Sequence, residues 1–158
     1  MSFATMLQGL VKGAVDFVVV GGVAGSAHGS AHVTNDLDIC YDPAPANLER
    51  LAARLVTWHA YPREIEPGLP FIMDVRTLRA APILTLQTTE GALACLDAIK
   101  GVGDWKAVRR RSERVEAFGV TLRILSLDAL IDAKRATGRP KDIVQLVELE
   151  ALRALRGE

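Results

Sequence analysis

The chain has 158 residues, of which 49% are hydrophobic, and its 19 basic residues balance its 19 acidic ones. This length suits a single domain over 1–158, the apolar share excludes a disordered chain, and the balanced charge excludes a protein-wide field that attracts nucleic acid or acidic membranes. The N-terminal segment lacks both a run of about 18 apolar residues and the basic start of a signal peptide, so we expect a cytoplasmic protein with no membrane contact.

Helices and strands alternate in the first part of the chain. Apolar residues at helical spacing predict helices over 3–13 and 46–58. The apolar runs DFVVV (16–20) and LDICY (37–41) predict two strands, the first of them buried. Between these strands, the small residues of 23–31 predict a short helix that packs closely against the first strand.

The middle of the chain is less regular. Proline and glycine over 60–72 predict a loop, and the following apolar runs predict strands over 83–89 and 92–99. A basic stretch over 104–112 has helical spacing. Residues 115–126 predict a hairpin or a bent strand that turns at Gly119.

A pair of helices over 127–157 closes the chain. Ser126 or Leu127 opens the first helix, Gly138 ends it, and Pro140 begins the second. Taken together, the elements predict an α+β fold: a small mixed β-sheet flanked by helices that lie mostly on one face.

Two short motifs carry the functional interpretation. Gly21 and Gly22 end the first predicted strand, where glycine allows a sharp turn and a close approach to a ligand, and where a following helix offers free N–H groups to phosphate. Asp36 and Asp38 stand two residues apart in the second strand, so both point to the same face. Their carboxylates repel each other unless a cation neutralises them, and magnesium prefers such oxygen ligands. Each motif alone is typical of an ordinary turn or an exposed strand start; together they predict a phosphate cradle beside a metal site.

Residues 21–39, GGVAGSAHGSAHVTNDLDI, resemble the signature of the nucleotidyltransferase superfamily, which has the DNA polymerase β-like fold. They are most similar to the small bacterial branch of AbiEii-type toxins and MNT-like proteins. The segment AKRATGRPKD (133–142) resembles the lysine and aspartate segment of that branch. The resemblance covers most of the chain. It implies a nucleotidyltransferase fold and transfer of a nucleoside monophosphate from an NTP to a hydroxyl of RNA, such as tRNA, or of protein, in a toxin–antitoxin setting.

The resemblance also assigns residues. Nucleotide contacts would fall to five positions: Gly21, Gly22, Ser30, His32 and Thr34. Asp36 and Asp38 would bind magnesium, as two ions in a fully active enzyme, and would serve catalysis. Lys134 would contact the phosphates, and Asp142 would orient Lys134 or the acceptor. Ordinary helix-end and helix-start signals are the structural alternative for this last segment.

Two positions depart from the family pattern. The family usually supplies a third carboxylate from a later strand, and the matching position here holds Ala94, with Asp74 and Asp97 as possible substitutes. The family often has an arginine where this chain has His32. Loss of the third carboxylate weakens two-metal chemistry. The alternative prediction is therefore a catalytically weakened module of the same fold that binds a nucleotide or a protein partner.

The remaining signals are weaker. Lys106, Arg109, Arg110, Arg111 and Arg114 form a basic run that is typical of a solvated face and could also guide an RNA acceptor. The two cysteines of the chain have neither zinc-ligand spacing nor a disulfide pattern, so we expect buried free thiols.

Overall fold

The computed structural model describes residues 3–66 and 68–157. Its helices are α1 (Phe3–Lys12), α2 (Gly21–Ala27), α3 (Pro45–Thr57), α4 (Val75–Ala80), α5 (Trp105–Arg110), α6 (Leu127–Thr137) and α7 (Pro140–Leu155). Its strands are β1 (Phe17–Val20), β2 (Asp36–Tyr41), β3 (Tyr61–Pro62), β4 (Ile83–Thr88), β5 (Gly91–Leu96), β6 (Ala98–Ile99), β7 (Gly103–Asp104), β8 (Ser112–Ala117) and β9 (Val120–Leu125).

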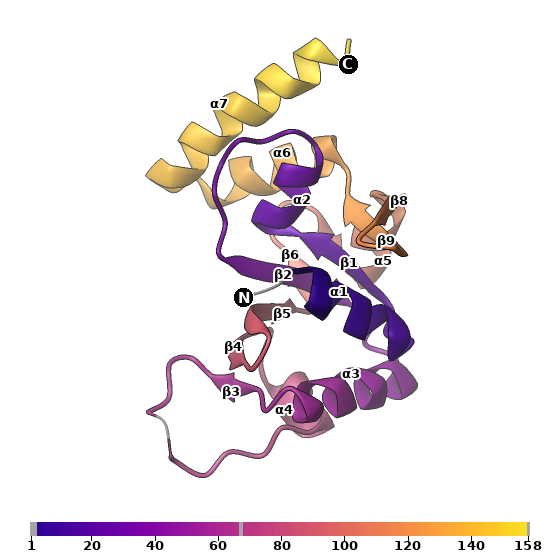
Figure 1. Cartoon of the computed structure of the whole chain (residues 1–158). Coiled ribbons are helices and arrows are strands. Elements are labelled where there is room, and N and C mark those ends of the chain that lie inside the picture. Colours follow the sequence, from indigo (N-terminus) through magenta and orange to yellow (C-terminus); the bar gives the residue numbers. More distant parts are fainter. Residues whose placement is uncertain (1–2, 67, 158) are drawn as a thin grey trace.

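One mixed sheet of seven strands organises the fold, in the order β3-β4-β5-β2-β1-β9-β8 (Figure 1). β2 runs antiparallel to β1 and parallel to β5, while β1 runs parallel to β9. β6 and β7 form a separate two-stranded ribbon. The predicted α+β fold with a mixed sheet flanked by helices is confirmed.

Most predicted elements are also confirmed, within one or two residues at each end. The predictions for α1, β1, β2, α3, β4 and α6 rested on clear periodicity or on capping residues. Ser126 caps α6 by accepting a hydrogen bond from the Ala129 N–H at 3.2 Å. Gly138 ends α6 with a left-handed φ of 63°, and Pro140 stands at the start of α7.

α2 differs from its prediction. It begins at Gly21, directly after β1, and ends at Ala27, whereas the small residues predicted a helix over 23–31. Gly29 follows with φ of 109°, a backbone conformation that other residues rarely adopt and that no helix continues. Residues 28–35 therefore form an irregular segment between α2 and β2, and this segment forms one wall of the site described below.

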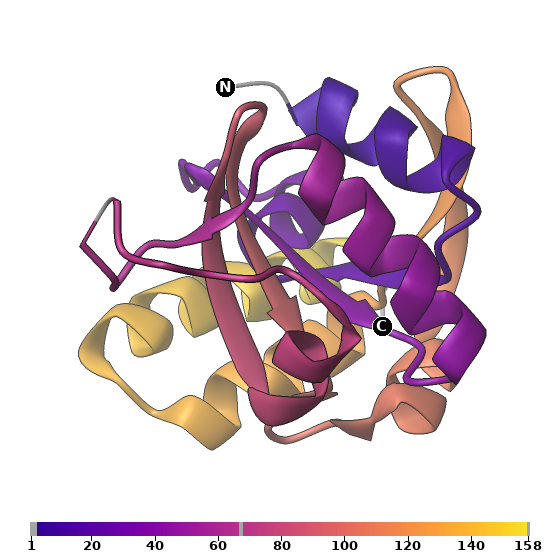
Figure 2. The ribbon, with the colours of Figure 1, turned by 90° about the horizontal axis from the view of Figure 1, so that it is seen from below.

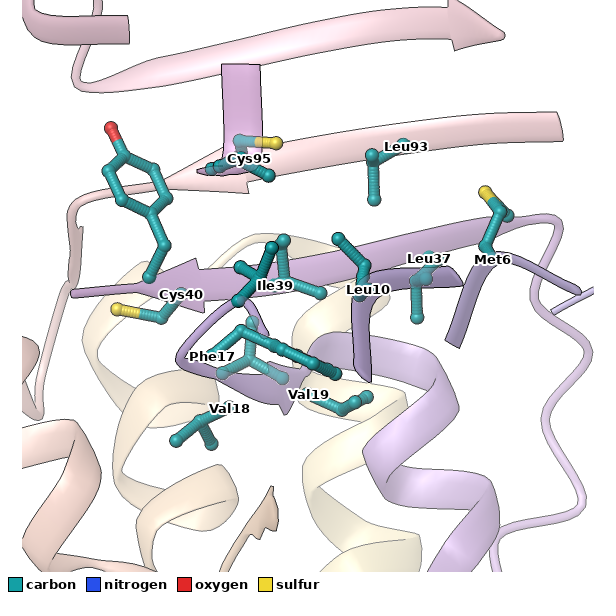
Figure 3. Close-up of a cluster of buried hydrophobic side chains, with 14 of the residues drawn as sticks. Met6, Leu10, Phe17, Val18, Val19, Leu37, Ile39, Cys40, Leu93 and Cys95 are labelled. Atoms are coloured by element: carbon teal, nitrogen blue, oxygen red, sulfur yellow. The ribbon is translucent and has the colours of Figure 1, made fainter. Parts of the chain in front are cut away.

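The sheet is covered on both faces. β1 is buried along its whole length, and Phe17 and Val19 face the same side as Leu37 and Ile39 of β2. On that side lie α1, α3 and α4, with Leu10 of α1 close to these side chains (Figure 3). α2, α5 and α6 lie on the other side, and α7 packs against α6 (Figure 2). The prediction that the helices lie mostly on one face is wrong, because a strand that is apolar throughout must exclude water from both faces.

The segment predicted as a loop over 60–72 contains a short strand. Tyr61 and Pro62 pair with β4 at the edge of the sheet, where proline is tolerated because one side of the strand needs no hydrogen bonds. α4, which follows this segment, was not predicted. Asp74 caps it by accepting a hydrogen bond from the Thr77 N–H at 3.0 Å, but six residues are too few to show helical periodicity.

The predicted strand over 92–99 is divided. β5 ends at Leu96, and the Asp97 N–H instead binds the Pro82 carbonyl at 3.1 Å. The last two residues of the predicted strand form β6, which pairs with β7 in the separate ribbon; β7, of only two residues, was not predicted. The hairpin turning at Gly119 is confirmed, although its first strand, β8, begins at Ser112 rather than at 115.

Cys40 and Cys95 are buried free thiols, as predicted, and burial raises the pKa of each to about 12. Among the helices of 3–66 and 68–157, none is long and apolar enough to cross a membrane.

Candidate functional site

A cleft of about 410 Å³ lies between α2, the segment that follows it, β2, α6 and α7. It is lined by residues from both ends of the chain: Gly21, Gly22, Gly25, Ser30, His32, Val33, Thr34, Asn35, Asp36, Asp38, Leu130, Lys134, Arg139, Lys141, Gln145, Glu148 and Leu149. Every residue that the sequence assigned to nucleotide or metal binding lines this cleft. Asp142, the remaining assigned residue, is fully buried behind the cleft wall.

Neighbouring side chains lie so close to Gly21 and Gly22 that neither position has room for a Cβ atom. Gly21 has a φ of 66°, and a Cβ built on it would overlap a carboxylate oxygen of Asp38. A Cβ on Gly22 would lie 2.7 Å from the Thr34 hydroxyl oxygen, which donates a hydrogen bond to the Asp36 carbonyl at 3.2 Å. The turn after β1 therefore leaves room for the Asp38 and Thr34 side chains directly against the backbone.

Replacing Gly21 with alanine is expected to destabilise the protein by more than the backbone strain alone. Gly119 is the matched control, since its φ is 77° and nothing lies within 4 Å of a Cβ built there. Gly119→Ala should cost about 1–2 kcal/mol, the strain of a left-handed residue. Gly21→Ala should cost about 1–3 kcal/mol more, because the Asp38 carboxylate must move. Urea unfolding measures both, and equal losses would show that Asp38 does not need this space.

Asp36 and Asp38 project from β2 toward the cleft. The Asp36 carboxylate accepts a hydrogen bond from Arg63, with Nη1 3.2 Å from Oδ2. Burial, followed by the charge of Asp36, raises the pKa of Asp38 to about 6, against weaker opposing effects of Arg63, Lys134 and Lys141. Any further cation that approaches such a buried carboxyl group stabilises its ionised form.

Within the described part of the chain, no third carboxylate joins this pair. β2 and β5 run in parallel register with Asp38 beside Ala94, so the neighbouring strand offers a methyl group at this point. Asp97 lies past the end of β5, where its charge adds to the effect of burial in raising the pKa of Cys40 and Tyr41. Asp74 caps α4. Neither lines the cleft.

The donor set fits one divalent cation better than two. Asp36 and Asp38 are hard oxygen donors on one face, and burial together with the charge of Asp36 raises the pKa of Asp38. Across the described ranges 3–66 and 68–157, no group of three or more His, Cys, Asp or Glu side chains is arranged to hold a metal ion.

Asp142 binds the side chains of Lys134 and Arg139 on the opposite wall of the cleft. Its carboxylate lies 3.3 Å from Lys134 Nζ and 2.7 Å from Arg139 Nε, and it also accepts the Arg139 N–H. These hydrogen bonds, chiefly that from Arg139, hold the pKa of Asp142 well below its usual range. Asp142 is therefore a positioning residue that keeps Lys134 and Arg139 at the cleft.

Glu148 of α7 closes the far side of the cleft. It accepts hydrogen bonds from the Ser30 hydroxyl at 2.5 Å and from the Ala31 N–H at 3.0 Å, and these bonds lower its pKa. The segment after α2 is thereby tied to α7. Sequence reasoning missed Glu148 and Arg63, because their partners are distant in the chain and no local pattern marks them. It also missed Gln145, which lines the cleft from α7.

No family model and no curated protein matches the sequence. Solved structures do resemble it. The antibiotic-resistance factor ANT(2'')-Ia has a TM-score of 0.55 at 15% identity, with 96% of this chain and 89% of that chain covered. The fold is that of the nucleotidyltransferases.

Further neighbours share the nucleotidyltransferase fold. A candidate nucleotidyltransferase from Thermotoga maritima (TM1012) has a TM-score of 0.52 at 15% identity, over 99% of this chain and 94% of that one. ANT(2'')-Ia bound to adenylyl-2''-tobramycin has a TM-score of 0.55 at 16% identity, over 96% and 95%. At these identities the likeness concerns the fold alone. The assignment to the AbiEii and MNT-like branch stays a prediction.

Proposed function

We propose that the cleft binds a nucleoside triphosphate with magnesium and transfers the nucleoside monophosphate to a hydroxyl acceptor. The observation that carries this proposal is the position of Asp36 and Asp38 beside the Gly21-Gly22 turn, with Lys134 in the same cleft. Negative and positive groups thus flank one space. That arrangement suits a metal ion and a triphosphate together.

Each group has a distinct role in the proposal. Asp36 and Asp38 would hold the magnesium, which when bound neutralises phosphate charge. Lys134, Arg139 and Lys141 would contact the phosphates, and the Gly21-Gly22 turn lets the chain approach them closely. Asp142 would act through Lys134 and Arg139, which it positions. The other residues that the sequence assigned to nucleotide binding, Ser30, His32 and Thr34, would contact the nucleoside and exclude water.

The acceptor is a hydroxyl of RNA, such as tRNA, or of protein, and we place this activity in the cytoplasm, in a toxin–antitoxin setting. A fold neighbour was solved with adenylyl-2''-tobramycin, so a small-molecule hydroxyl belongs among the acceptors to be tested. This comparison supports the type of reaction and leaves the acceptor to experiment.

A second function is favoured by Ala94. Because β5 supplies a methyl group beside Asp38, the metal position has only Asp36 and Asp38 within the described part of the chain, although an acceptor hydroxyl must also lose its proton there. The second proposal is a module that binds the nucleotide and turns it over poorly or not at all, acting as a sensor or partner-binding protein.

A transfer assay tests the proposal. The purified chain is incubated with magnesium and each α-labelled NTP, with total tRNA, the chain itself or tobramycin as acceptor. Asp38→Asn is the inactive variant, and Asp97→Asn is the matched control outside the cleft. Label transferred by the wild type and the control but not by Asp38→Asn would establish the enzyme. Nucleotide binding by calorimetry without transfer would establish the second function, and absence of both would overturn the proposed function.

A further inference from the structure

A second cavity, of about 400 Å³, lies at the other end of β1. Phe17, at the start of β1, lines this cavity, whereas Gly21, just after β1, lines the cleft. The two positions are about 13 Å apart along an extended chain. The walls of the second cavity, here called the arginine cavity, come from the last turn of α1 and the residues after it, from α5 and from the strands β8 and β9.

Three arginines from three elements line the arginine cavity. Arg109 comes from α5, Arg114 from β8 and Arg123 from β9. Arg114 and Arg123 stand directly opposite each other in the β8–β9 register, an arrangement in which like charges destabilise a sheet. Their proximity has an electrostatic consequence, since burial and then the charges of Arg109 and Arg114 lower the pKa of Arg123.

These arginines have no carboxylate partner within 3–66 and 68–157. Arg123 donates a hydrogen bond to the Ser112 hydroxyl at 3.3 Å, and no ion pair between described residues involves any of the three. By contrast, nearby Arg111 pairs with Asp132 at 2.7 Å. The concentration of positive charge in the arginine cavity is therefore not balanced by the described part of the protein.

The other walls suit a compact ligand. Trp105, Val15 and Leu122 contribute apolar side chains to the lining. Asp16 is the one acidic side chain among the residues found to line the cavity, and its backbone N–H is held by Asn47 at 2.7 Å. A volume of about 400 Å³ lies in the range of small-molecule sites.

We propose that the arginine cavity binds a small ligand carrying two or more phosphate charges, at a site separate from the cleft. Arginine guanidinium groups match phosphate oxygens through paired hydrogen bonds, and three of them converge here from different elements. The ligand supplies the negative charge that the cross-strand arginine pair lacks. The volume of about 400 Å³ suits a small molecule, whereas the backbone of an RNA would instead follow the exposed basic residues Lys106 and Arg110 on α5.

Inorganic pyrophosphate is the probe, and the indole N–H signals of the two tryptophans in an NMR spectrum are the readout. Trp105 lines the arginine cavity, while Trp58 is buried in the core and serves as the internal reference, assigned with Trp58→Phe. We expect pyrophosphate to shift the Trp105 signal in a saturable way. The shift should persist in a Lys134→Ala, Lys141→Ala double variant, which weakens anion binding in the cleft.

Arg123→Gln and, separately, Arg114→Gln should weaken pyrophosphate binding about tenfold or more. Arg110→Gln, on the outer face of α5, should leave it within about twofold, because exposed charges are screened. Without ligand, Arg123→Gln should unfold at the same or a higher urea concentration than the wild type, since it removes repulsion. A clear loss of ligand-free stability in both arginine variants, no shift at Trp105, or a shift produced by an RNA oligonucleotide but not by pyrophosphate would each overturn the proposal.

Discussion

Replacing Asp38 with asparagine is expected to stabilise the metal-free protein by about 3 kcal/mol at pH 8 while it removes nucleotidyl transfer. The pKa of Asp38 rises from 3.8 to about 6 in the folded protein, mainly because of burial and then because of Asp36. Each pKa unit corresponds to about 1.4 kcal/mol. Asp38, which binds the metal in the proposed function, thus lowers the stability of the metal-free fold, as is common for residues at active sites.

The gain in stability from Asp38→Asn should depend on pH, in a direction set by the raised pKa of Asp38. Below about pH 3, Asp38 is protonated in both the folded and the unfolded chain, so it does not lower the free energy of unfolding. As the pH rises from 4 through 6, the unfolded chain releases this proton first, and the folded state becomes less stable relative to it. The gain from Asp38→Asn should therefore be small at pH 4.5 and complete above pH 7. Urea unfolding at both pH values measures it.

Asp36→Asn is the matched control for this prediction. The side chain of Asp36 is 43% exposed and already paired with Arg63, so its removal should change stability much less and should leave Arg63 without a partner. Magnesium should stabilise the wild type more than either variant, because only the wild type has both carboxylates. A gain from Asp38→Asn that is the same at pH 4.5 and pH 8 would mean that charge burial is not its cause.

The part of the site that could be predicted from the sequence is the part that is local. Asp36 and Asp38 alternate with buried Leu37, so the period of a strand fixes their common direction before any tertiary contact is known. Gly21 and Gly22 end an apolar strand, where glycine marks a sharp turn. Asp38 and Thr34, whose side chains occupy the space that a Cβ would need at these glycines, lie within the same short stretch of the chain.

The rest depends on contacts between distant residues. Glu148 meets Ser30 across 118 positions, and Arg63 reaches Asp36 from a segment predicted as a loop. No periodicity carries such information, because pairing of this kind is set by how α7 packs and where β3 joins the sheet edge. The cover of both sheet faces could not be predicted for a related reason: the apolar run of β1 indicates that the strand is buried, but it does not indicate which helices bury it.

Replacing Ala94 with aspartate is expected to raise nucleotidyl transfer about tenfold or more if the missing carboxylate is what limits the reaction. Ala94 lies beside Asp38 in the β2–β5 register, with Thr85 of β4 on its other side, and its side chain is only 5% exposed. An aspartate there would place a third carboxylate next to Asp38. Without metal it should destabilise the protein, because it adds a buried like charge.

Ala94→Asn separates charge from size in this experiment, since its side chain has the same shape but cannot be a negatively charged ligand. We expect the aspartate variant to unfold more easily than the asparagine variant in EDTA and to recover that difference as magnesium is added. Transfer measured with saturating NTP should then rise for Ala94→Asp alone. Recovery by magnesium without a rise in transfer would mean that the position completes a metal site but that the acceptor, rather than the carboxylate, limits turnover. No response to magnesium in either variant would count against Asp36 and Asp38 as metal ligands.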